Sequence, residues 1–271
     1  MNHLFFQLNK LKDSLKDKLI FLFLDYDGTL TPIVQSPDKA IISKKTMEIL
    51  RRLLKNPHCR VAIISGRALK DIKNKIGLEG IIYAGNHGLE IDGPKIKFKA
   101  PVPSGYMAIL KKIKAILKKK LSKIRGVIIE DKGLTLSVHY RLVDIKDAGL
   151  VKTIFHETLA HYIVNNKIKI KPGKKVLEIR PPLEWDKGKI VLWLLARLKF
   201  DLGKEPYIPI YIGDDITDED AFKALKNAGL TVFVGDPGSS RAKYYLKNTQ
   251  EVTEFLEQIL KIKTDRDICL D

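Results

Sequence analysis

The hydrophobic and polar positions of this chain form short apolar runs that alternate with amphipathic stretches. Apolar runs of four to eight residues that end at turn-forming residues are typical of buried strands. Three such runs lie at 21–24, 60–64 and 80–84, and apolar residues at helical spacing separate them. Ser43 is the expected N-cap of the first intervening helix, and residues 4–18 have the spacing of a helix before the first strand. This alternation predicts a doubly wound, parallel α/β sheet.

The pattern changes after a connector rich in proline and glycine. Helical spacing over 106–124 and 144–164 is followed each time by two short alternating runs, which lie at 127–130 and 135–141, and at 167–171 and 175–180 around a Pro172-Gly173 turn. A helix with a hairpin, repeated once, indicates an antiparallel α+β module. The α/β pattern resumes with a helix over 188–198 and strands at 207–212 and 231–234. We therefore expect one Rossmann-like core from residues 1–100 and 182–271, with residues 101–181 inserted as an α+β cap.

The positive charge of the chain is concentrated in the expected cap. The formal net charge is +17, and residues 95–180 carry 21 basic and 6 acidic side chains, an excess of 15. Such an excess suits a nucleic acid, an anionic membrane surface or an anionic small substrate, and also a solvated lysine-rich surface. The basic helix over 106–124 needs no partner if its apolar stripe packs on the cap sheet and its lysines face water. We expect neither nucleic acid nor membrane as a partner.

Composition and cysteine content suggest an intracellular globular protein. The chain has 271 residues, of which 45% are hydrophobic, enough for one large domain or two smaller ones. Its longest uncharged apolar run near the N-terminus is too short to cross a bilayer, and no signal-peptide pattern precedes it. Cys59 and Cys269 are too few for a disulfide framework. We expect a cytoplasmic monomer.

The first candidate for chemistry is the pair Asp25 and Asp27, which directly follows a buried strand. Gly28 and Thr29 then turn the backbone. Two carboxylates this close repel each other, and a hard cation such as Mg²⁺ removes that cost. A lone pair of this kind is more often a solvated strand end, so the pair needs support from elsewhere in the chain.

That support comes from other strand ends and helix starts that carry polar groups. They are Ser65 after the second strand, Lys187 after the cap, and Asp214 and Asp215 after the strand at 207–212. The carboxyl ends of parallel strands meet at one edge of a sheet, so these side chains can converge on one crevice.

These motifs resemble those of a known superfamily. Asp25-Tyr26-Asp27-Gly28-Thr29-Leu30, Ser65-Gly66-Arg67, Lys187 and Gly213-Asp214-Asp215 are similar to the four motifs of the haloacid dehalogenase superfamily of phosphatases. More narrowly, the chain resembles trehalose-6-phosphate phosphatases in the segments 84–90, 178–181, 186–188 and 213–220. The resemblance covers residues 21–237, and related sugar phosphatases share parts of it.

The resemblance implies a role for each core residue. Asp25 is the expected nucleophile, and Asp27 the acid and base that serves the leaving oxygen and the attacking water. Mg²⁺ is expected on Asp25, Asp214 and the Asp27 backbone carbonyl, supported by Asp215 and Asp218. Phosphate is expected at Ser65, Lys187 and the open turn at Gly28. We choose Lys187 over Lys189 because the family pattern places lysine before the glycine.

The sugar specificity is expected from the cap, because the core chemistry is common to many phosphatases. Glu130, Lys132 and Glu178 lie at strand ends of a module with few acids, and similar positions hold the unphosphorylated glucose in trehalose-6-phosphate phosphatases. Surface ion pairs with neighbouring lysines are the alternative. Arg67, Asn86, His87 and Arg180 are expected hinge or pocket residues that bind substrate.

The sequence as a whole predicts a Mg²⁺-dependent phosphatase that hydrolyses trehalose 6-phosphate through an aspartyl phosphate. One alternative is a phosphatase of the same superfamily for a sucrose- or mannosyl-type phosphate. An alternative of another class is a basic nucleic-acid-binding protein with an inactive core, which the complete set of acids and the lack of an aromatic stacking platform disfavour.

Overall fold

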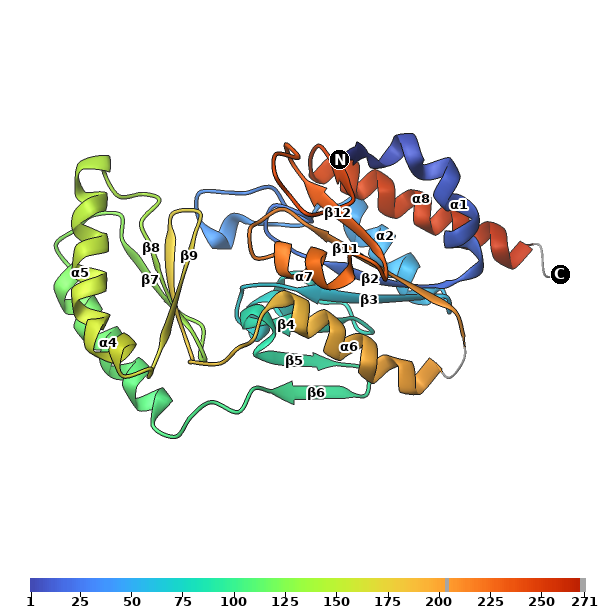
Figure 1. Ribbon diagram of the computed structural model, residues 1–271. Helices are drawn as coiled ribbons and strands as arrows, with labels where there is room; N and C mark the ends of the chain where they lie inside the picture. The colour runs from blue at the N-terminus through green and yellow to red at the C-terminus, as the bar shows by residue number, and fades with distance from the viewer. Residues whose placement is uncertain (203–204, 269–271) are drawn as a thin grey trace. The chain divides into compact units, whose positions relative to one another are not determined.

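The structure, a computed structural model, describes residues 1–202 and 205–268 and divides the chain into two units (Figure 1). The first unit joins Met1–Phe98 to the chain from Trp185 onward, and the second is Lys99–Glu184. Among the residues described, no helix combines the length and apolar character needed to cross a membrane.

The first unit is built on a nine-stranded sheet. Its strand order is β1 (Asn2–His3), β13 (Tyr244–Leu246), β12 (Leu230–Val234), β11 (Tyr207–Gly213), β2 (Leu19–Leu24), β3 (Cys59–Ile64), β4 (Ile82–Gly85), β5 (Glu90–Gly93) and β6 (Ile96–Lys99). From β1 to β4 all neighbours pair in parallel, and β5 is antiparallel to β4. The carboxyl ends of β2, β3, β4 and β11 therefore lie at one edge.

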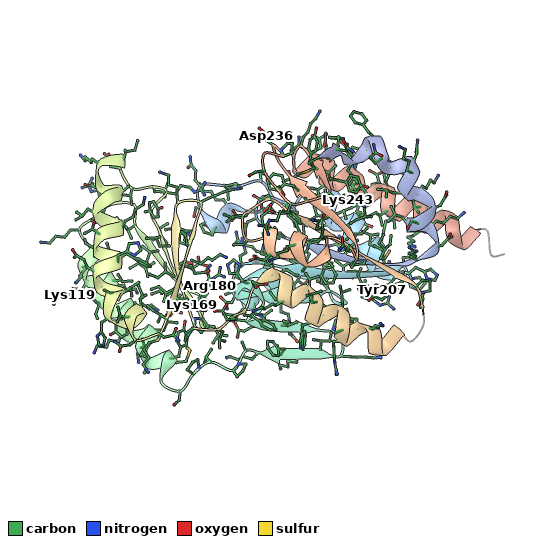
Figure 2. All side chains as sticks on the ribbon, viewed as in Figure 1. Lys119, Lys169, Arg180, Tyr207, Asp236 and Lys243 are labelled. Atoms are coloured by element: carbon green, nitrogen blue, oxygen red, sulfur yellow. The ribbon has the colours of Figure 1, made fainter. Side chains whose placement is uncertain are left out.

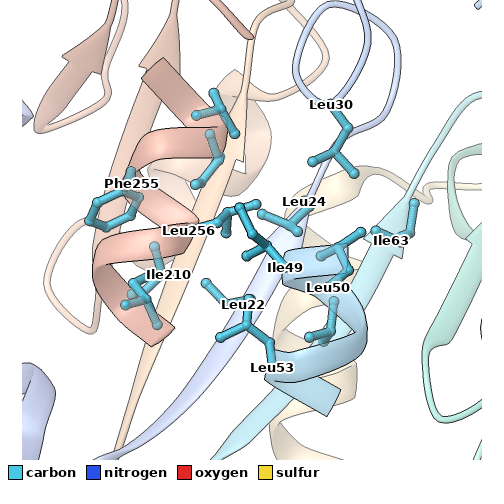
Figure 3. Packing of buried hydrophobic residues seen from close by; sticks show 14 of the residues in the cluster. Leu22, Leu24, Leu30, Ile49, Leu50, Leu53, Ile63, Ile210, Phe255 and Leu256 are labelled. Atoms are coloured by element: carbon cyan, nitrogen blue, oxygen red, sulfur yellow. The ribbon is translucent and has the colours of Figure 1, made fainter. Parts of the chain in front are cut away.

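Helices cover both faces of this sheet, as a doubly wound sheet requires. One face packs against α1 (Leu8–Asp17), α2 (Lys44–Lys55), α3 (Leu69–Ile76) and α8 (Thr249–Ile268), and the other against α6 (Lys187–Leu202) and α7 (Glu219–Leu225). Strand β2 is buried at every position because Leu22 and Leu24 point to the first face, whereas Phe21 and Phe23 point to the second. Figure 3 shows part of the hydrophobic core on the first face, where Leu22 and Leu24 pack near side chains of α2 and α8. Ser43 caps α2 by accepting a hydrogen bond from the Thr46 amide, as predicted.

The second unit is a four-stranded antiparallel sheet with two helices. The strand order is β7 (Ile128–Asp131), β8 (Leu136–His139), β10 (Val176–Arg180) and β9 (Lys169–Gly173), and the helices are α4 (Tyr106–Leu121) and α5 (Ile145–Val164). Apolar side chains of alternate strand positions pack with both helices, among them Leu136, Val138 and Ile179. The other face of this sheet carries polar side chains, because strand residues alternate between faces.

The fold class is confirmed as an α/β core with an inserted α+β unit. The sequence reasoning missed β1, β5, β6, β13 and α8, and the short 3₁₀ helices at Pro37–Lys39 and Asn86–Gly88. The helix expected over 4–18 is present as a 3₁₀ helix at Leu4–Gln7 that continues into α1. The expected turn at Pro172-Gly173 is wrong, since both residues pair within β9 and the chain turns after them.

Candidate active site

Asp25 directly follows β2 and is almost completely buried, with 5% of its surface exposed. Its backbone amide donates to the carbonyl of Ile212 (3.0 Å), which continues the pairing of β2 with β11 beyond the strand end. The backbone of Asp25 is therefore held in place by the neighbouring strand. Asp214 follows β11 and is 7% exposed, so the two acids leave neighbouring strands at the same edge.

A buried lysine connects two of the acids. Lys187, the first residue of α6, donates from Nζ to Asp25 Oδ1 and to Asp218 Oδ1, each at 2.7 Å. Burial opposes its charge, but the charges of Asp218 and Asp25 raise the Lys187 pKa above its ordinary value, so it remains protonated. Lys189 is exposed and is not the lysine on Asp25.

Burial also perturbs the nucleophile candidate. It raises the pKa of Asp25 well above the ordinary value, against the opposing charge of Lys187, and Asp218 and Asp214 raise this pKa further. An ionised Asp25 is thus costly beside these acids unless more positive charge is present.

Both carboxylate oxygens of Asp218 accept hydrogen bonds within this site. Oδ1 accepts from Lys187 and from the Tyr211 hydroxyl (2.6 Å), and Oδ2 accepts from the amides of Asp214 (3.1 Å) and Asp215 (2.9 Å). A carboxylate has about four lone-pair sites, and four donors fill them. Burial first, and then the charges of Asp218 and Asp25, raise the Tyr211 pKa, so its hydroxyl stays a donor.

The donor set fits a small hard cation. Asp25, Asp214 and Asp218 each offer one oxygen, and these oxygens lie within 4.8 Å of one another. Because the oxygens of Asp218 already accept four hydrogen bonds, Asp25 and Asp214 are the better candidates for ligands. Gly28 leaves room beside them: its φ is +97°, and a Cβ there would lie 2.2 Å from Asp214 Oδ2. Oxygen-rich sites of this kind suit Mg²⁺.

Asp27 faces an arginine. Arg67 donates from Nε to Asp27 Oδ2 (2.8 Å) and from Nη2 to Asp27 Oδ1 (2.6 Å), a bidentate pair. The same guanidinium binds Asp71 (2.8 Å) and lies over the Tyr26 ring, 5.3 Å from its centroid. Burial opposes the charge, but Asp27 and Asp71 raise the Arg67 pKa above its ordinary value. The Asp27 side chain is 42% exposed, so it is held in one orientation while solvent and ligands can reach it.

Ser65 follows β3 and is buried, with its amide on the Ala84 carbonyl (2.9 Å) and its hydroxyl accepting from the Arg67 amide (3.1 Å). Asn86 is completely buried and donates from Nδ2 to Glu90 (2.9 Å), and the His87 ring lies next to Gly66. Asp215 is partly exposed and accepts the Ile216 amide (2.6 Å). The structure thus places all the core residues expected from the sequence in the segments that follow β2, β3, β4 and β11 and at the start of α6.

The expected cap residues gather on the polar face of the α+β sheet. Glu178 is 5% exposed and accepts from Lys132 Nζ (3.0 Å) and from Arg180 Nε, and Thr135 donates to it at 3.4 Å. Glu130 contacts His139 Nε2 at 2.8 Å, one strand away. Lys169 and Arg180 are opposite each other on the neighbouring strands β9 and β10 (Figure 2).

The basic helix α4, which carries Lys119, packs by its apolar stripe, as expected (Figure 2). Leu110, Ile113 and Leu117 of this helix are buried.

Sequence reasoning missed four residues of these networks. They are Tyr26, Asp71, Tyr211 and His139. Two had a signal: Asp71 lies in the first turn of the helix that follows Arg67, and Tyr211 places a hydroxyl inside an apolar strand. The others depend on contacts that spacing does not show.

Comparison with known proteins identifies the family of this chain. The family model described as "Trehalose-phosphatase" matches residues 23–250. A probable trehalose-phosphate phosphatase 3 from Oryza sativa subsp. japonica is 38% identical over 93% of this chain and 72% of its own length. The C-terminal domain of Candida albicans trehalose-6-phosphate phosphatase has a TM-score of 0.77 and 28% identity, over 94% of this chain and 97% of that one. A haloacid dehalogenase-like hydrolase from Bacteroides thetaiotaomicron shares the fold, with a TM-score of 0.59, 20% identity and coverage of 89% and 99%.

Proposed function

The chain belongs to the trehalose-phosphatase family, and on that basis we propose that it hydrolyses trehalose 6-phosphate to trehalose and phosphate. We propose further that Mg²⁺ is required and that the phosphoryl group passes through an aspartyl phosphate. The observation that carries the proposal is the buried lysine that joins Asp25 to Asp218 beside Asp214.

Asp25 is the proposed nucleophile. A carboxylate divides the slow hydrolysis of a phosphate monoester into two easier steps. Lys187 donates a hydrogen bond to Asp25 Oδ1, which orients the carboxylate, and the lysine charge would help to balance the charge of the phosphate. When bound, Mg²⁺ on Asp25, Asp214 and the Asp27 carbonyl would neutralise phosphate charge and lower the cost of ionising Asp25. Asp215 and Asp218 would support the metal site without binding the ion directly.

Asp27 is the proposed proton donor to the leaving sugar oxygen, and then the base for the attacking water. The bidentate pair with Arg67 fixes the plane of the Asp27 carboxylate, and the group remains accessible to the leaving oxygen and to water. Ser65 would donate to a phosphoryl oxygen, and Gly28 would leave the backbone open to it.

The α+β unit is the proposed source of sugar specificity. Its polar face carries carboxylates and cations that form directed hydrogen bonds, as sugar hydroxyls require. Glu130, Lys132 and Glu178 are the proposed contacts, with Arg180 orienting Glu178. Glu130 lies in β7 and contacts His139, whereas Lys132 lies in the turn after β7 and contacts Glu178.

A phosphate-release panel tests this function. With Mg²⁺, the protein is expected to release phosphate from trehalose 6-phosphate far faster than from sucrose 6-phosphate, mannosylglycerate phosphates or glucose 6-phosphate. Asp25→Asn should abolish turnover on every substrate while the fold is kept. Glu130→Ala should reduce kcat/KM for trehalose 6-phosphate much more than for p-nitrophenyl phosphate.

Three outcomes would contradict the proposal in different ways. Equal rates on many sugar phosphates would remove the substrate. Activity retained in Asp25→Asn would remove the nucleophile. No phosphate release at all, with salt-sensitive binding of nucleic acid, would favour the alternative of another class.

A further inference from the structure

The turn after β4 contains backbone conformations that residues with side chains rarely adopt. Asn86 has φ +50° and His87 has φ +53°, and Gly88 follows with φ +85°. Within residues 1–202 and 205–268, these are the only two adjacent non-glycine residues with positive φ. Each left-handed residue costs free energy, so such a turn persists only where the surroundings determine it.

The left-handed turn directs two backbone amides at the loop that carries Ser65. The Asn86 amide donates to the Arg67 carbonyl (2.6 Å), and the His87 amide donates to the Ser65 carbonyl (2.9 Å). These two bonds hold both ends of the Ser65–Arg67 segment. One end bears the hydroxyl proposed to bind phosphate, and the other bears the guanidinium that holds Asp27.

Packing closes the same turn on two sides. The His87 ring lies so close to Gly66 that a Cβ there would be 2.5 Å from His87 Nε2. On the opposite side, a Cβ at Gly88 would be 2.0 Å from Ile190 Cδ1, and the Trp185 indole donates to the Gly88 carbonyl (2.8 Å). Ile190 and Trp185 flank Lys187 in the chain, so the turn is packed between the Ser65 loop and the start of α6.

We propose that Asn86 and His87 are positioning residues whose left-handed backbone holds the Ser65–Arg67 loop in its phosphate-binding conformation. This role replaces the substrate contact expected from the sequence and rests on the proposed phosphatase function. Asn86 suits it because asparagine tolerates left-handed φ better than most residues, and because its side chain is completely buried. The turn therefore acts on the phosphate shared by all substrates and is indifferent to the sugar.

The experiment compares two substitutions at one position with a matched control. Asn86→Ala makes the left-handed conformation unfavourable, whereas Asn86→Gly keeps it accessible and removes the same side chain. Asn166, with φ +48°, has the same residue type and conformation in the α+β unit, so Asn166→Ala is the control for strain alone. Each variant is assayed on trehalose 6-phosphate and on p-nitrophenyl phosphate, and its affinity for inorganic phosphate with Mg²⁺ is measured by thermal shift.

We expect Asn86→Ala to lower kcat/KM on p-nitrophenyl phosphate by about tenfold and to weaken phosphate binding in parallel. The fall on trehalose 6-phosphate should be at least as large, because the displaced Arg67 also holds Asp27, which serves the leaving sugar oxygen. Asn86→Gly should recover to within about threefold of the wild type, and Asn166→Ala should lower thermal stability without changing phosphate affinity. If both substitutions at Asn86 impair trehalose 6-phosphate alone, the side chain is a sugar ligand and the proposal is wrong. Unaltered phosphate binding in Asn86→Ala would also overturn it.

If Asn86→Ala does not fold, Asn86→Gly alone decides between the two roles. A loss of activity on trehalose 6-phosphate alone in Asn86→Gly would overturn the proposal, and near-normal kinetics on both substrates would support it. The wild type separates this inference from the proposed function. A wild type that hydrolyses p-nitrophenyl phosphate but not trehalose 6-phosphate would remove the proposed substrate, while phosphate affinity would still test the turn.

Discussion

Asp218→Asn distinguishes a supporting residue from a metal ligand. The Asp218 side chain is fully buried and accepts from Lys187, Tyr211 and two backbone amides at 2.6 to 3.1 Å. Asparagine has the same shape but keeps only one oxygen, so its amide group must face two of these donors. Two lost hydrogen bonds to a charged group amount to about 3–6 kcal/mol. Relief of repulsion with Asp25 offsets part of this, and we expect a net loss of about 3 kcal/mol in the free energy of unfolding.

Asp214→Asn is the matched control, since Asp214 is the proposed ligand on the neighbouring segment. It should raise the Mg²⁺ concentration needed for half-maximal activity by about tenfold or more, with a smaller loss of stability than Asp218→Asn. Urea unfolding gives the stability of both variants, and phosphate release against Mg²⁺ concentration gives their metal dependence. Asp218→Asn should lose activity that high Mg²⁺ does not restore. A stable Asp218→Asn that recovers at high Mg²⁺ would show that Asp218 binds the metal, and the reasoning would be refuted.

Three further predictions follow from other contacts. Arg67→Lys loses the two hydrogen bonds that orient Asp27, so kcat for trehalose 6-phosphate should fall about tenfold or more. The kcat for p-nitrophenyl phosphate should change little, because its leaving group needs no proton. Equal falls on both substrates would argue against a role of Arg67 through Asp27. Gly28→Ala places a Cβ 2.2 Å from Asp214 Oδ2, so kcat/KM should fall about a hundredfold, and normal kinetics would contradict the close approach. Burial raises the pKa of Tyr83 to about 12, so this tyrosine should keep its proton in the folded state while an unfolded chain loses it near pH 10. The stability that the Tyr83 proton contributes is complete below the unfolded pKa and should fall by about 1.4 kcal/mol per pH unit as the pH rises toward the folded pKa. Alkaline unfolding of the wild type and of Tyr83→Phe measures this contribution, and identical unfolding profiles would refute the prediction.

The architecture was predictable where hydrophobic periodicity is strong. The runs at β2, β3 and β11 are apolar at nearly every position, because a parallel sheet covered on both faces buries both sides of each strand. The strands β5 and β6 were missed because they are short and half polar, and their residues resemble a connector. Strand β1 has only two residues, and its pairing with β13 joins segments at opposite ends of the chain, which no local pattern encodes.

The site residues were predictable as positions but not as contacts. Strand ends and motif spacing place Asp25, Ser65 and Asp214 at one sheet edge. The sequence does not show that Asp218 accepts four hydrogen bonds, or that Asp27 contacts Arg67. Both sets of contacts depend on residues that different elements bring together. The contact between His139 and Glu130 likewise depends on the register of β7 and β8, which spacing along the chain does not show.

The most direct test of the account is chemical trapping of the phosphorylated enzyme. Borohydride reduces an acyl phosphate to an alcohol, which would convert the side chain of the attacked aspartate into that of homoserine. When the protein turns over trehalose 6-phosphate with Mg²⁺ and is quenched into borohydride, peptide mass spectrometry should find homoserine at position 25, and none without substrate. Turnover without any modification at Asp25, or with modification at Asp27 or Asp214 instead, would contradict the central claim that Asp25 is the nucleophile.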